Sequence, residues 1–322
     1  MTKYKILEIL LKNKGTFVSG EYLSSVLLVS RTAIWKGINS LKKSGYNIVG
    51  VNNKGYCLYD DNNINEFDIK TNIQCKEIGS KILYFEQIDS TNTYIKKEVD
   101  SLQHGTVVIA EEQINGRAKN EKYFYSPKEK GIYMSILLKK NIFLDSLKLL
   151  SLTSTVAVIR GIFQSTGISP MSDWNSIIIN NKKVAGILTE CNIECDTNNI
   201  EYIVIGIGIN VNNLSFPKTI KDKVTSLRLE KGIEINRKTL ICNILNELEN
   251  LICDKRYISN RKILIEEYLK DFLFLDKVVT LKTNTRIIVG KVIGINEKGG
   301  VILLKENNKK EIFYTGIIKE KK

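Results

Sequence analysis

The segment from Glu111 to Ser126 constrains the fold of this 322-residue chain more than any other. It is polar, it contains a single glycine, Gly116, and two strand-like apolar runs flank it, Thr106–Glu111 and Gly131–Leu138. Polar loops of this length inside a compact domain usually serve a function or are disordered. We therefore expect a functional loop between two buried strands of one sheet.

Composition excludes several classes of protein. Hydrophobic residues make up 43% of the chain, which is typical of a globular protein with a sizeable core. The net charge of +13 is compatible with a nucleic-acid partner, but charge alone does not establish one without a motif beside it. Among the six cysteines only Cys191 and Cys195 are close in sequence, and His104 is the single histidine, so no four-ligand zinc set is expected.

The sequence also predicts where the protein is found. The N-terminus lacks the apolar core of a secretion signal. The longest apolar run, Tyr202–Val211, is far shorter than the roughly 20 residues that a membrane-spanning helix needs. Reduced cysteines are typical of the cytoplasm. We expect a cytoplasmic protein that does not interact with a membrane.

The first sixty residues have the pattern of a winged helix-turn-helix. Apolar spacing predicts three helices and a hairpin, at residues 3–13, 19–28, 30–43 and 48–59. Ser30 would cap the third helix. Its buried face would consist of Ala33, Ile34, Ile38 and Leu41. The alternative is a small helical packing module.

The exposed face of the third helix favours DNA as the partner. Such a helix places its first turns in a major groove, where cations contact phosphates and polar side chains contact bases. We predict that the DNA-binding residues are Ser30, Arg31, Thr32, Trp35, Lys36 and Asn39.

The remainder of the chain has a mixed pattern. A polar linker is expected at 60–66, followed by a strand at 82–86, a helix starting near Asp89, and a long helix over 144–164. A hairpin is expected at 176–190, and a strand at 200–211 contains Gly206 and Gly208, where a ligand could approach the backbone closely. Helices are expected over 236–272, and short strands from 278 to 314 suggest a small barrel.

Four motifs occur in order in the central part. They are Asp89-Ser-Thr-Asn92, Glu112-Gln-x-x-Gly-Arg117, Lys183-Val-Ala-Gly-Ile-Leu-x-Glu190 and Gly206-Ile-Gly-Ile-Asn210. With the domain order, they resemble the bifunctional biotin protein ligase and biotin-operon repressor family over essentially the whole chain. The resemblance implies an α+β protein with a winged helix-turn-helix at 1–64, a mixed α/β biotin- and ATP-binding catalytic domain at 65–272, and an SH3-like β-barrel at 273–322.

The resemblance also implies roles for individual residues. Lys183, Arg117 and Lys119 would be catalytic, and Lys183 would stabilise charge that develops at the carboxylate and α-phosphate. The nucleotide site would include Lys122, Phe124, Asn175 and Asn210, with Phe124 stacking on adenine. The biotin-binding residues would be Ser90, Thr91, Asn92, Gln113, Gly116, Arg117, Ala118, Lys119, Lys183, Gly206 and Gly208.

Substrates and partners follow from the same resemblance. Biotin and ATP would be the substrates, with Mg²⁺ and with no metal site made by the protein alone. The partners would be a biotin carboxyl carrier domain that accepts the biotinoyl group on a lysine, operator DNA, and a second copy of the chain when the adenylate is bound.

Two motifs depart from the family pattern on the nucleotide side. The family loop Gly-Arg-Gly-Arg-x-Gly-Arg is here Gly116-Arg-Ala-Lys-Asn-Glu-Lys122, and lysine keeps the charge of arginine without its two-pronged grip on phosphate. The family motif Lys-Trp-Pro-Asn-Asp is here Ser172-Asp-Trp-Asn-Ser176, in which Asp173 could replace the lost carboxylate. One residue of slip in a strand would, however, turn that side chain to the opposite face.

Three hypotheses remain open from the sequence. The first is a ligase and repressor with a relaxed nucleotide site. The second is a diverged paralogue that binds biotin and DNA as a transcriptional regulator with little or no ligase activity. The third is an acyl ligase for lipoate or octanoate, which the winged helix, the barrel and the Gln113 and Lys183 pattern disfavour.

Overall fold

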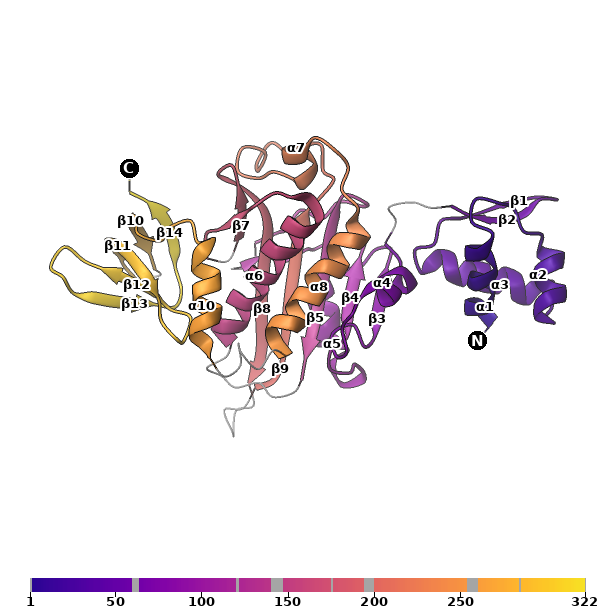
Figure 1. The fold of residues 1–322 in the computed structure, drawn as a ribbon, viewed down its shortest axis with the longest axis horizontal. Coiled ribbons are helices and arrows are strands. Elements are labelled where there is room, and N and C mark those ends of the chain that lie inside the picture. The colour runs from indigo at the N-terminus through magenta and orange to yellow at the C-terminus, as the bar shows by residue number, and fades with distance from the viewer. Residues whose placement is uncertain are drawn as a thin grey trace.

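The computed structural model describes residues 2–59, 64–119, 122–139, 147–174, 176–193, 200–253, 260–283 and 285–321. The molecule is elongated (Figure 1). A helical N-terminal domain lies at one end, a large α/β domain in the middle, and a β-sheet domain at the other end.

The N-terminal domain has the predicted three helices and hairpin. Its elements are α1 (Thr2–Lys12), α2 (Gly20–Leu27), α3 (Arg31–Lys43), β1 (Ile48–Val51) and β2 (Gly55–Leu58). The Ser30 hydroxyl accepts a hydrogen bond from the Ala33 N–H at 3.2 Å, so Ser30 caps α3 as predicted. Strands β1 and β2 pair antiparallel, with Ile48 opposite Leu58.

The buried face of α3 differs from the prediction at one position. Ala33 is half-buried, and Gly37 takes its place in the buried stripe. Gly37 lies against α1, where an added Cβ would come 2.5 Å from Ile6 Cδ1. The close contact between α1 and α3 therefore includes Gly37 in the buried face of α3.

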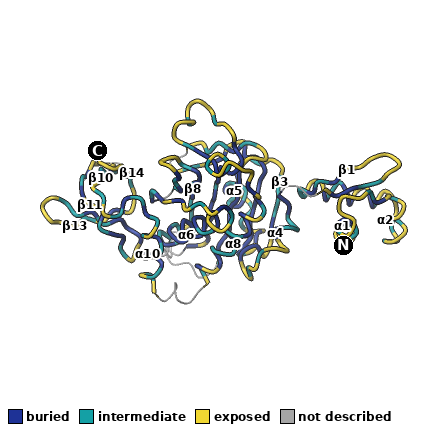
Figure 2. Tube along the Cα trace, turned by 45° about the horizontal axis from the view of Figure 1, so that its top comes forward, coloured by how far each residue is buried: buried dark blue, intermediate teal, exposed yellow. Residues whose placement is uncertain are grey.

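A seven-stranded sheet forms the centre of the middle domain. Strand order is β3-β4-β5-β9-β8-β7-β6, in which β3 and β4 are parallel and the other neighbours are antiparallel. In chain order these strands span Ile82–Phe85, Val107–Ala110, Gly131–Leu138, Met171–Ser172, Ser176–Ile179, Lys182–Ile193 and Ile200–Asn210 for β3 to β9. Figure 2 shows that buried residues are concentrated along this sheet and the helices packed on it.

Three helices, α6 (Leu147–Thr166), α8 (Arg237–Cys253) and α10 (Arg261–Lys270), lie together on one face of the sheet (Figure 1). Two short helices, α5 (Thr91–Lys97) and α7 (Leu227–Lys231), also belong to this domain, with a 3-10 turn at Val99–Ser101. Among the described helices only α6 is long and apolar enough to cross a bilayer, and 61% of its apolar window is buried inside the domain. A buried core helix of a folded domain can have the same length and hydropathy, so α6 is weak evidence for a membrane span.

The predicted linker at 60–66 is wrong at its C-terminal end. Helix α4 (Glu66–Asn72) begins there, and the Asn65 side chain accepts a 2.7 Å hydrogen bond from the Asp68 N–H as its cap, while residues 60–63 lie outside the described part of the chain. Phe67 packs against the N-terminal core, and Ile69 belongs to the central core. The sequence missed α4 because a seven-residue helix shows less than two full turns of apolar periodicity.

The C-terminal domain is a five-stranded antiparallel sheet. Its strands are β10 (Val278–Lys282), β11 (Ile287–Ile295), β12 (Val301–Leu304), β13 (Lys310–Phe313) and β14 (Ile317–Glu320), in the order β13-β12-β11-β10-β14. Strand β11 passes through Gly290 without a break, and β14 lies beyond the predicted strands, which end at residue 314. No described pairing joins β13 to β14, so the predicted closure into a barrel is not confirmed.

The C-terminal sheet shares a hydrophobic core with the middle domain. Val279, Leu281 and Val292 belong to the same buried cluster as the helices on the central sheet. The backbone N–H of Leu273 donates to Ser172 O at 2.9 Å. This continuous core holds the start of β14 beside the central domain.

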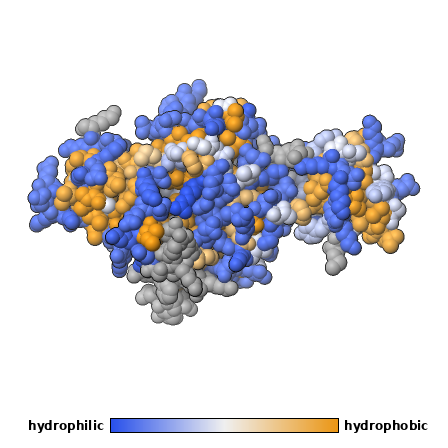
Figure 3. All heavy atoms as spheres, in the orientation of Figure 1, coloured by the Kyte–Doolittle hydropathy of each residue, from blue (hydrophilic) through white to orange (hydrophobic). Residues whose placement is uncertain are grey.

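Figure 3 shows that hydrophilic residues cover most of the visible face of the middle domain.

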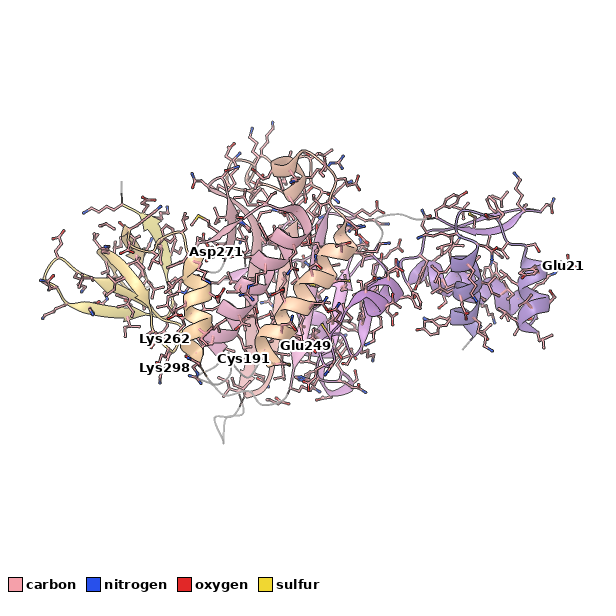
Figure 4. All side chains as sticks on the ribbon, viewed as in Figure 1. Glu21, Cys191, Glu249, Lys262, Asp271 and Lys298 are labelled. Atoms are coloured by element: carbon pink, nitrogen blue, oxygen red, sulfur yellow. The ribbon has the colours of Figure 1, made fainter. Side chains whose placement is uncertain are left out.

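The Glu249 side chain on α8, labelled in Figure 4, ties this helix to the segment before β3. Its carboxylate accepts backbone hydrogen bonds from Lys76, Glu77 and Ile78 at 2.5, 3.0 and 2.7 Å. The side chain is almost fully buried, so removing it leaves N–H groups with no acceptor.

We expect Glu249→Ala to lower the free energy of unfolding of the middle domain by about 2–4 kcal/mol, because one buried and two part-buried N–H donors lose a charged acceptor. Urea unfolding measures this change when it is followed by the fluorescence of Trp174, which lies in the central core, in a Trp35→Phe background. Glu297→Ala, at an exposed turn, is the matched control and should stay within about 0.5 kcal/mol of the original. Equal effects of the two substitutions would contradict the assigned role.

Candidate functional site

The two faces of the central sheet have different roles. On β5 and β9, Ile132, Met134, Ile205 and Ile207 belong to the core under α6 and α8. The residues between them point to the other face, and there Ser135 lies opposite Gly206 in the pairing of the two strands. Helix α5 packs on this second face as well, through contacts with the same two strands.

A cavity of about 280 Å³ lies on this second face. It brings together most of the residues singled out from the sequence: Ser90, Thr91, Asn92, Gln113, Arg117, Ala118, Lys119, Lys122, Phe124, Lys183, Gly206 and Gly208. Ten further residues line the cavity, and among them only Asp173 was considered from the sequence, as a possible replacement for the lost carboxylate. They are Met134, Asp173, Ser176, Gly186, Ile187, Leu188, Ile207, Gly316, Ile317 and Ile318.

Two of the predicted residues lie elsewhere, and one is not described. The Asn210 amide donates to Thr225 O at 3.0 Å and does not line the cavity. Gly116 lies behind the lining, where an added Cβ would come 2.5 Å from Phe124 O and 2.6 Å from Ser126 Oγ. Its lack of a side chain therefore lets the loop fold back on itself. Asn175 lies outside the described residues.

Neutral polar side chains form one end of the cavity. Gln113 Oε1 accepts hydrogen bonds from the Thr91 N–H at 2.9 Å and the Thr91 hydroxyl at 3.1 Å. The Ser135 hydroxyl lies 2.6 Å from Thr91 Oγ1 and 2.5 Å from Asn92 Oδ1. Ser90 occupies the N-cap position of α5, but its side chain makes no capping hydrogen bond to the helix. Helix capping therefore does not explain the serine at this position.

The two strand glycines make room for other side chains of the site. An added Cβ at Gly206 would come 2.3 Å from Asn92 Oδ1, and at Gly208 it would come 2.7 Å from Phe124 Cε1. The Phe124 ring also meets Tyr133 edge-on, with 6.4 Å between the ring centroids. Within the chain, the groups that come closest to these glycines are the side chains of Asn92 and Phe124.

Cations also line the cavity, together with apolar residues such as Ile187 and Ile318. Lys183 lies on β8, and its backbone bonds to Lys223 O and to the Thr225 N–H, both at 2.9 Å. Burial lowers the pKa of the Lys183 ammonium, Asp173 opposes this, and Lys122 adds to it. The segment at 223–225, which the sequence did not single out, thus fixes the strand that carries this lysine.

The loop after Gly116 forms a narrow hairpin at the cavity. The Ala118 N–H donates to Lys122 O at 2.7 Å, and the Phe124 N–H donates to Gly116 O at 2.8 Å. Arg117 and Tyr123 are paired across it. Residues 120 and 121, the second of which is the unexpected glutamate, lie outside the described part.

The altered motif at 172–176 presents its carboxylate to the cavity. Trp174 is buried in the central core with a φ of 95°. Asp173 lines the cavity, and its Oδ1 accepts a 3.0 Å hydrogen bond from the Ser176 N–H. The altered motif therefore leaves an acid beside Lys183.

The predicted DNA-binding residues gather on α3. Ser30, Arg31, Thr32, Trp35 and Lys36 are exposed, and Asn39 is half-buried. Arg31 lies 3.3 Å from a Glu21 carboxylate oxygen on α2, an exposed ion pair. The exposed side of α3 thus carries the predicted cations and an aromatic ring that is 56% accessible.

Sequence reasoning missed several residues beside the cavity. Ser135 was a polar residue inside an apolar strand, which was a usable signal. Glu190 ended a recognised motif without receiving a role, although its carboxylate reaches Asn92. Residues Gly316 to Ile318 could not have been found, because nothing local indicates that the last strand meets the central domain.

Family comparisons cover the chain in three parts. An HTH domain matches residues 2–57, the biotin/lipoate A/B protein ligase family matches 84–210, and the biotin protein ligase C terminal domain matches 274–319. Among solved structures, biotin protein ligase from Aquifex aeolicus in complex with biotin and ATP has a TM-score of 0.66 and 26% identity, covering 76% of this chain and 99% of that one.

Similarity to individual proteins extends over the full length. The bifunctional ligase/repressor BirA of Bacillus spizizenii is 34% identical, and the alignment covers 97% of each chain. The protein of the same name from Escherichia coli is 27% identical over 90% of this chain and 88% of its own. With its three domains in the same order, this chain belongs to the bifunctional biotin ligase and repressor family.

Proposed function

We propose that this chain forms biotinoyl-AMP from biotin and ATP, transfers biotin to a lysine of a biotin carboxyl carrier domain, and represses biotin genes through its N-terminal domain. One observation carries the proposal. A single cavity is lined both by the neutral polar side chains of Ser90, Thr91, Asn92 and Gln113 and by four cations, Arg117, Lys119, Lys122 and Lys183. It therefore suits a ligand with a neutral polar head and a reacting anionic end.

The neutral end fits the ureido head of biotin. Thr91, Asn92, Gln113 and Ser90 offer amides and hydroxyls on largely buried side chains, where hydrogen bonds to a ligand replace those to water. Gly206 and Gly208 keep the sheet surface flat beneath the ligand.

The cationic end fits the chemistry of adenylation. A biotin carboxylate oxygen attacks the α-phosphorus of ATP, and pyrophosphate leaves. We assign Lys183 to the carboxylate and the α-phosphate, where a fixed cation stabilises the charge of the transition state. Arg117 and Lys119 support it from the loop, and Ala118 completes that wall.

The loop also closes over the nucleotide. Lys122 and Phe124 reach the cavity from the loop, and the aromatic ring is available to stack on adenine. Exclusion of water protects the mixed anhydride from hydrolysis. Asn175 stays in the proposal as a nucleotide contact. Asn210 acts through the segment at Thr225, which its amide holds.

Mg²⁺ is the metal that this reaction needs. It binds proteins through one or two carboxylates together with substrate phosphates, so it does not require a complete protein site. Asp173 is the one carboxylate among the described lining residues, and no cluster of three acidic, cysteine or histidine ligands occurs in the described parts. Asp173 would therefore hold the metal together with ATP, taking over from the acid lost at position 176.

The partners follow from the two activities. The biotinoyl group passes to the lysine amine of a carrier domain, and AMP leaves. We further propose that the adenylate-bound protein dimerises on operator DNA in the cytoplasm, and that the three parts divide at 1–64, 65–272 and 273–322. The C-terminal sheet would be an SH3-like fold that contributes the start of β14 to the cavity.

We expect the purified protein to release pyrophosphate when biotin, ATP and Mg²⁺ are present. Lys183→Ala should lower the rate by about 100- to 1,000-fold, because it removes a charge that stabilises the transition state. Tight biotin binding without pyrophosphate release would instead support a regulator without ligase activity. An unchanged rate for Lys183→Ala would remove this lysine from the mechanism.

The lowered pKa of Lys183 predicts the pH dependence of adenylation. A lysine whose pKa is lowered loses its proton at a lower pH than usual, so the rate should fall as the pH rises through that value. Arginine stays charged, so Lys183→Arg should remove this alkaline decline even if its rate is lower. The rate of pyrophosphate release from pH 7 to 10 tests this. The same decline in both proteins would assign it to another group.

We expect Lys36→Ala to weaken binding to DNA duplexes selected on the protein from a random library. Loss of one phosphate contact should reduce the slope of log affinity against log salt by about 1. Lys310→Ala, an exposed change on β13, is the control and should leave the slope unchanged. Fluorescence anisotropy at several salt concentrations measures both. Equal slopes for Lys36→Ala and the original protein would exclude α3 from the DNA interface.

A further inference from the structure

Glu190 ends one of the four motifs, yet adenylation gives it no role. It lies on β8, half-buried, near the neutral end of the cavity. One carboxylate oxygen accepts a 2.7 Å hydrogen bond from Asn92 Nδ2, and the other lies 2.8 Å from Lys96 Nζ on α5. Burial raises the pKa of the carboxyl, but the bonds to Lys96 and Asn92 outweigh this and the pKa is lowered, so the group is an anion at neutral pH.

A carboxylate fixes which way the Asn92 amide points. An ionised carboxylate only accepts hydrogen bonds, so the amide must present its NH₂ group to Glu190. Its oxygen then faces Ser135 Oγ at 2.5 Å, and the serine hydroxyl donates to it. The same serine oxygen lies 2.6 Å from Thr91 Oγ1, so Ser135 connects Asn92 to Thr91.

The hydrogen bonds at the other end of this row of side chains have a fixed direction as well. The Thr91 backbone N–H can only donate, so it holds Gln113 Oε1 towards itself at 2.9 Å. The NH₂ group of Gln113 then donates to Ser126 Oγ at 3.1 Å. A backbone donor and a carboxylate acceptor thus enclose a row of neutral side chains, each of which could otherwise turn either way.

We propose that Glu190, held by Lys96, is a positioning residue that sets the donor and acceptor pattern presented to the polar head of biotin. This rests on the proposed function, in which Asn92 and its neighbours bind that head. Only one amide hydrogen of Asn92 is used by Glu190, and the second remains a donor for a carbonyl in the cavity. Reversal of the amide would place an oxygen there and repel that carbonyl.

Glu190→Gln tests the charge while keeping the shape. A glutamine can donate or accept, so it no longer dictates the direction of the Asn92 amide. We expect the dissociation constant for biotin, measured by isothermal titration calorimetry, to rise about ten-fold, as for loss of one net hydrogen bond. The KM for ATP should stay within two-fold, because the change lies at the head end.

The chain offers a matched control on the same two strands. Glu201 on β9 accepts a 2.7 Å hydrogen bond from Asn192 Nδ2 on β8, but both side chains are exposed. Glu201→Gln removes the same kind of pair away from the cavity and should leave biotin affinity unchanged. Lys96→Met, which leaves the carboxylate in place, should weaken binding less than Glu190→Gln does.

A double-mutant cycle shows whether Glu190 acts through Asn92. If it does, Asn92→Ala alone and together with Glu190→Gln should have about the same affinity for biotin. Losses that multiply in the double variant, or a Glu190→Gln affinity within two-fold of the original, would overturn the inference. If Glu190→Gln lowers the thermal midpoint of unfolding, the biotin affinity of Lys96→Met is the deciding measurement. An affinity equal to that of the original protein would also overturn the inference. Failure of the unmodified protein to bind biotin would refute the proposed function itself.

Discussion

The alternation of side chains along β5 and β9 is the constraint on which the rest of the structure depends. Every second residue of these strands is buried under α6 and α8, while Ser135, Gly206 and Gly208 lie on the opposite face, which carries the site. A shift of one residue in their pairing would send Gly206 into the core and Ile205 into the site. Stability and binding are thus specified by the same two strands, on opposite faces.

A buried ion pair holds the functional loop against this sheet. Arg237 at the start of α8 donates to Glu111 at 2.6 Å and to Gly131 O at 3.2 Å. Both charged side chains are at most 3% exposed. Glu111 opens the loop and Gly131 begins the strand after it, so one guanidinium fixes both ends. Losing either partner would leave an uncompensated buried charge, which is strongly destabilising.

The sequence predicted most elements because their signals are local. Helices α1, α2, α3 and α6 and the long strands each show a clear apolar period, and caps such as Ser30 mark their ends. Most motif residues also proved to share one cavity. The exceptions have physical reasons: α4 is too short to show a period, and Asn210, although next to Gly208 in its motif, turns its amide to the segment at Thr225.

Contacts between distant segments were beyond the reach of the sequence. The altered motif at 172–176 offered both an aromatic ring and an acid, and only packing shows that Trp174 enters the core while Asp173 faces Lys183. Ser135 and Glu190 join the site through hydrogen bonds to α5, 43 and 98 residues away in sequence.

The sequence by itself therefore determined the domain order, the periodicity of the elements and the chemical types of the site residues. The tertiary structure decided which of them meet, because burial and the direction of a hydrogen bond depend on neighbours that the chain brings together only when it folds.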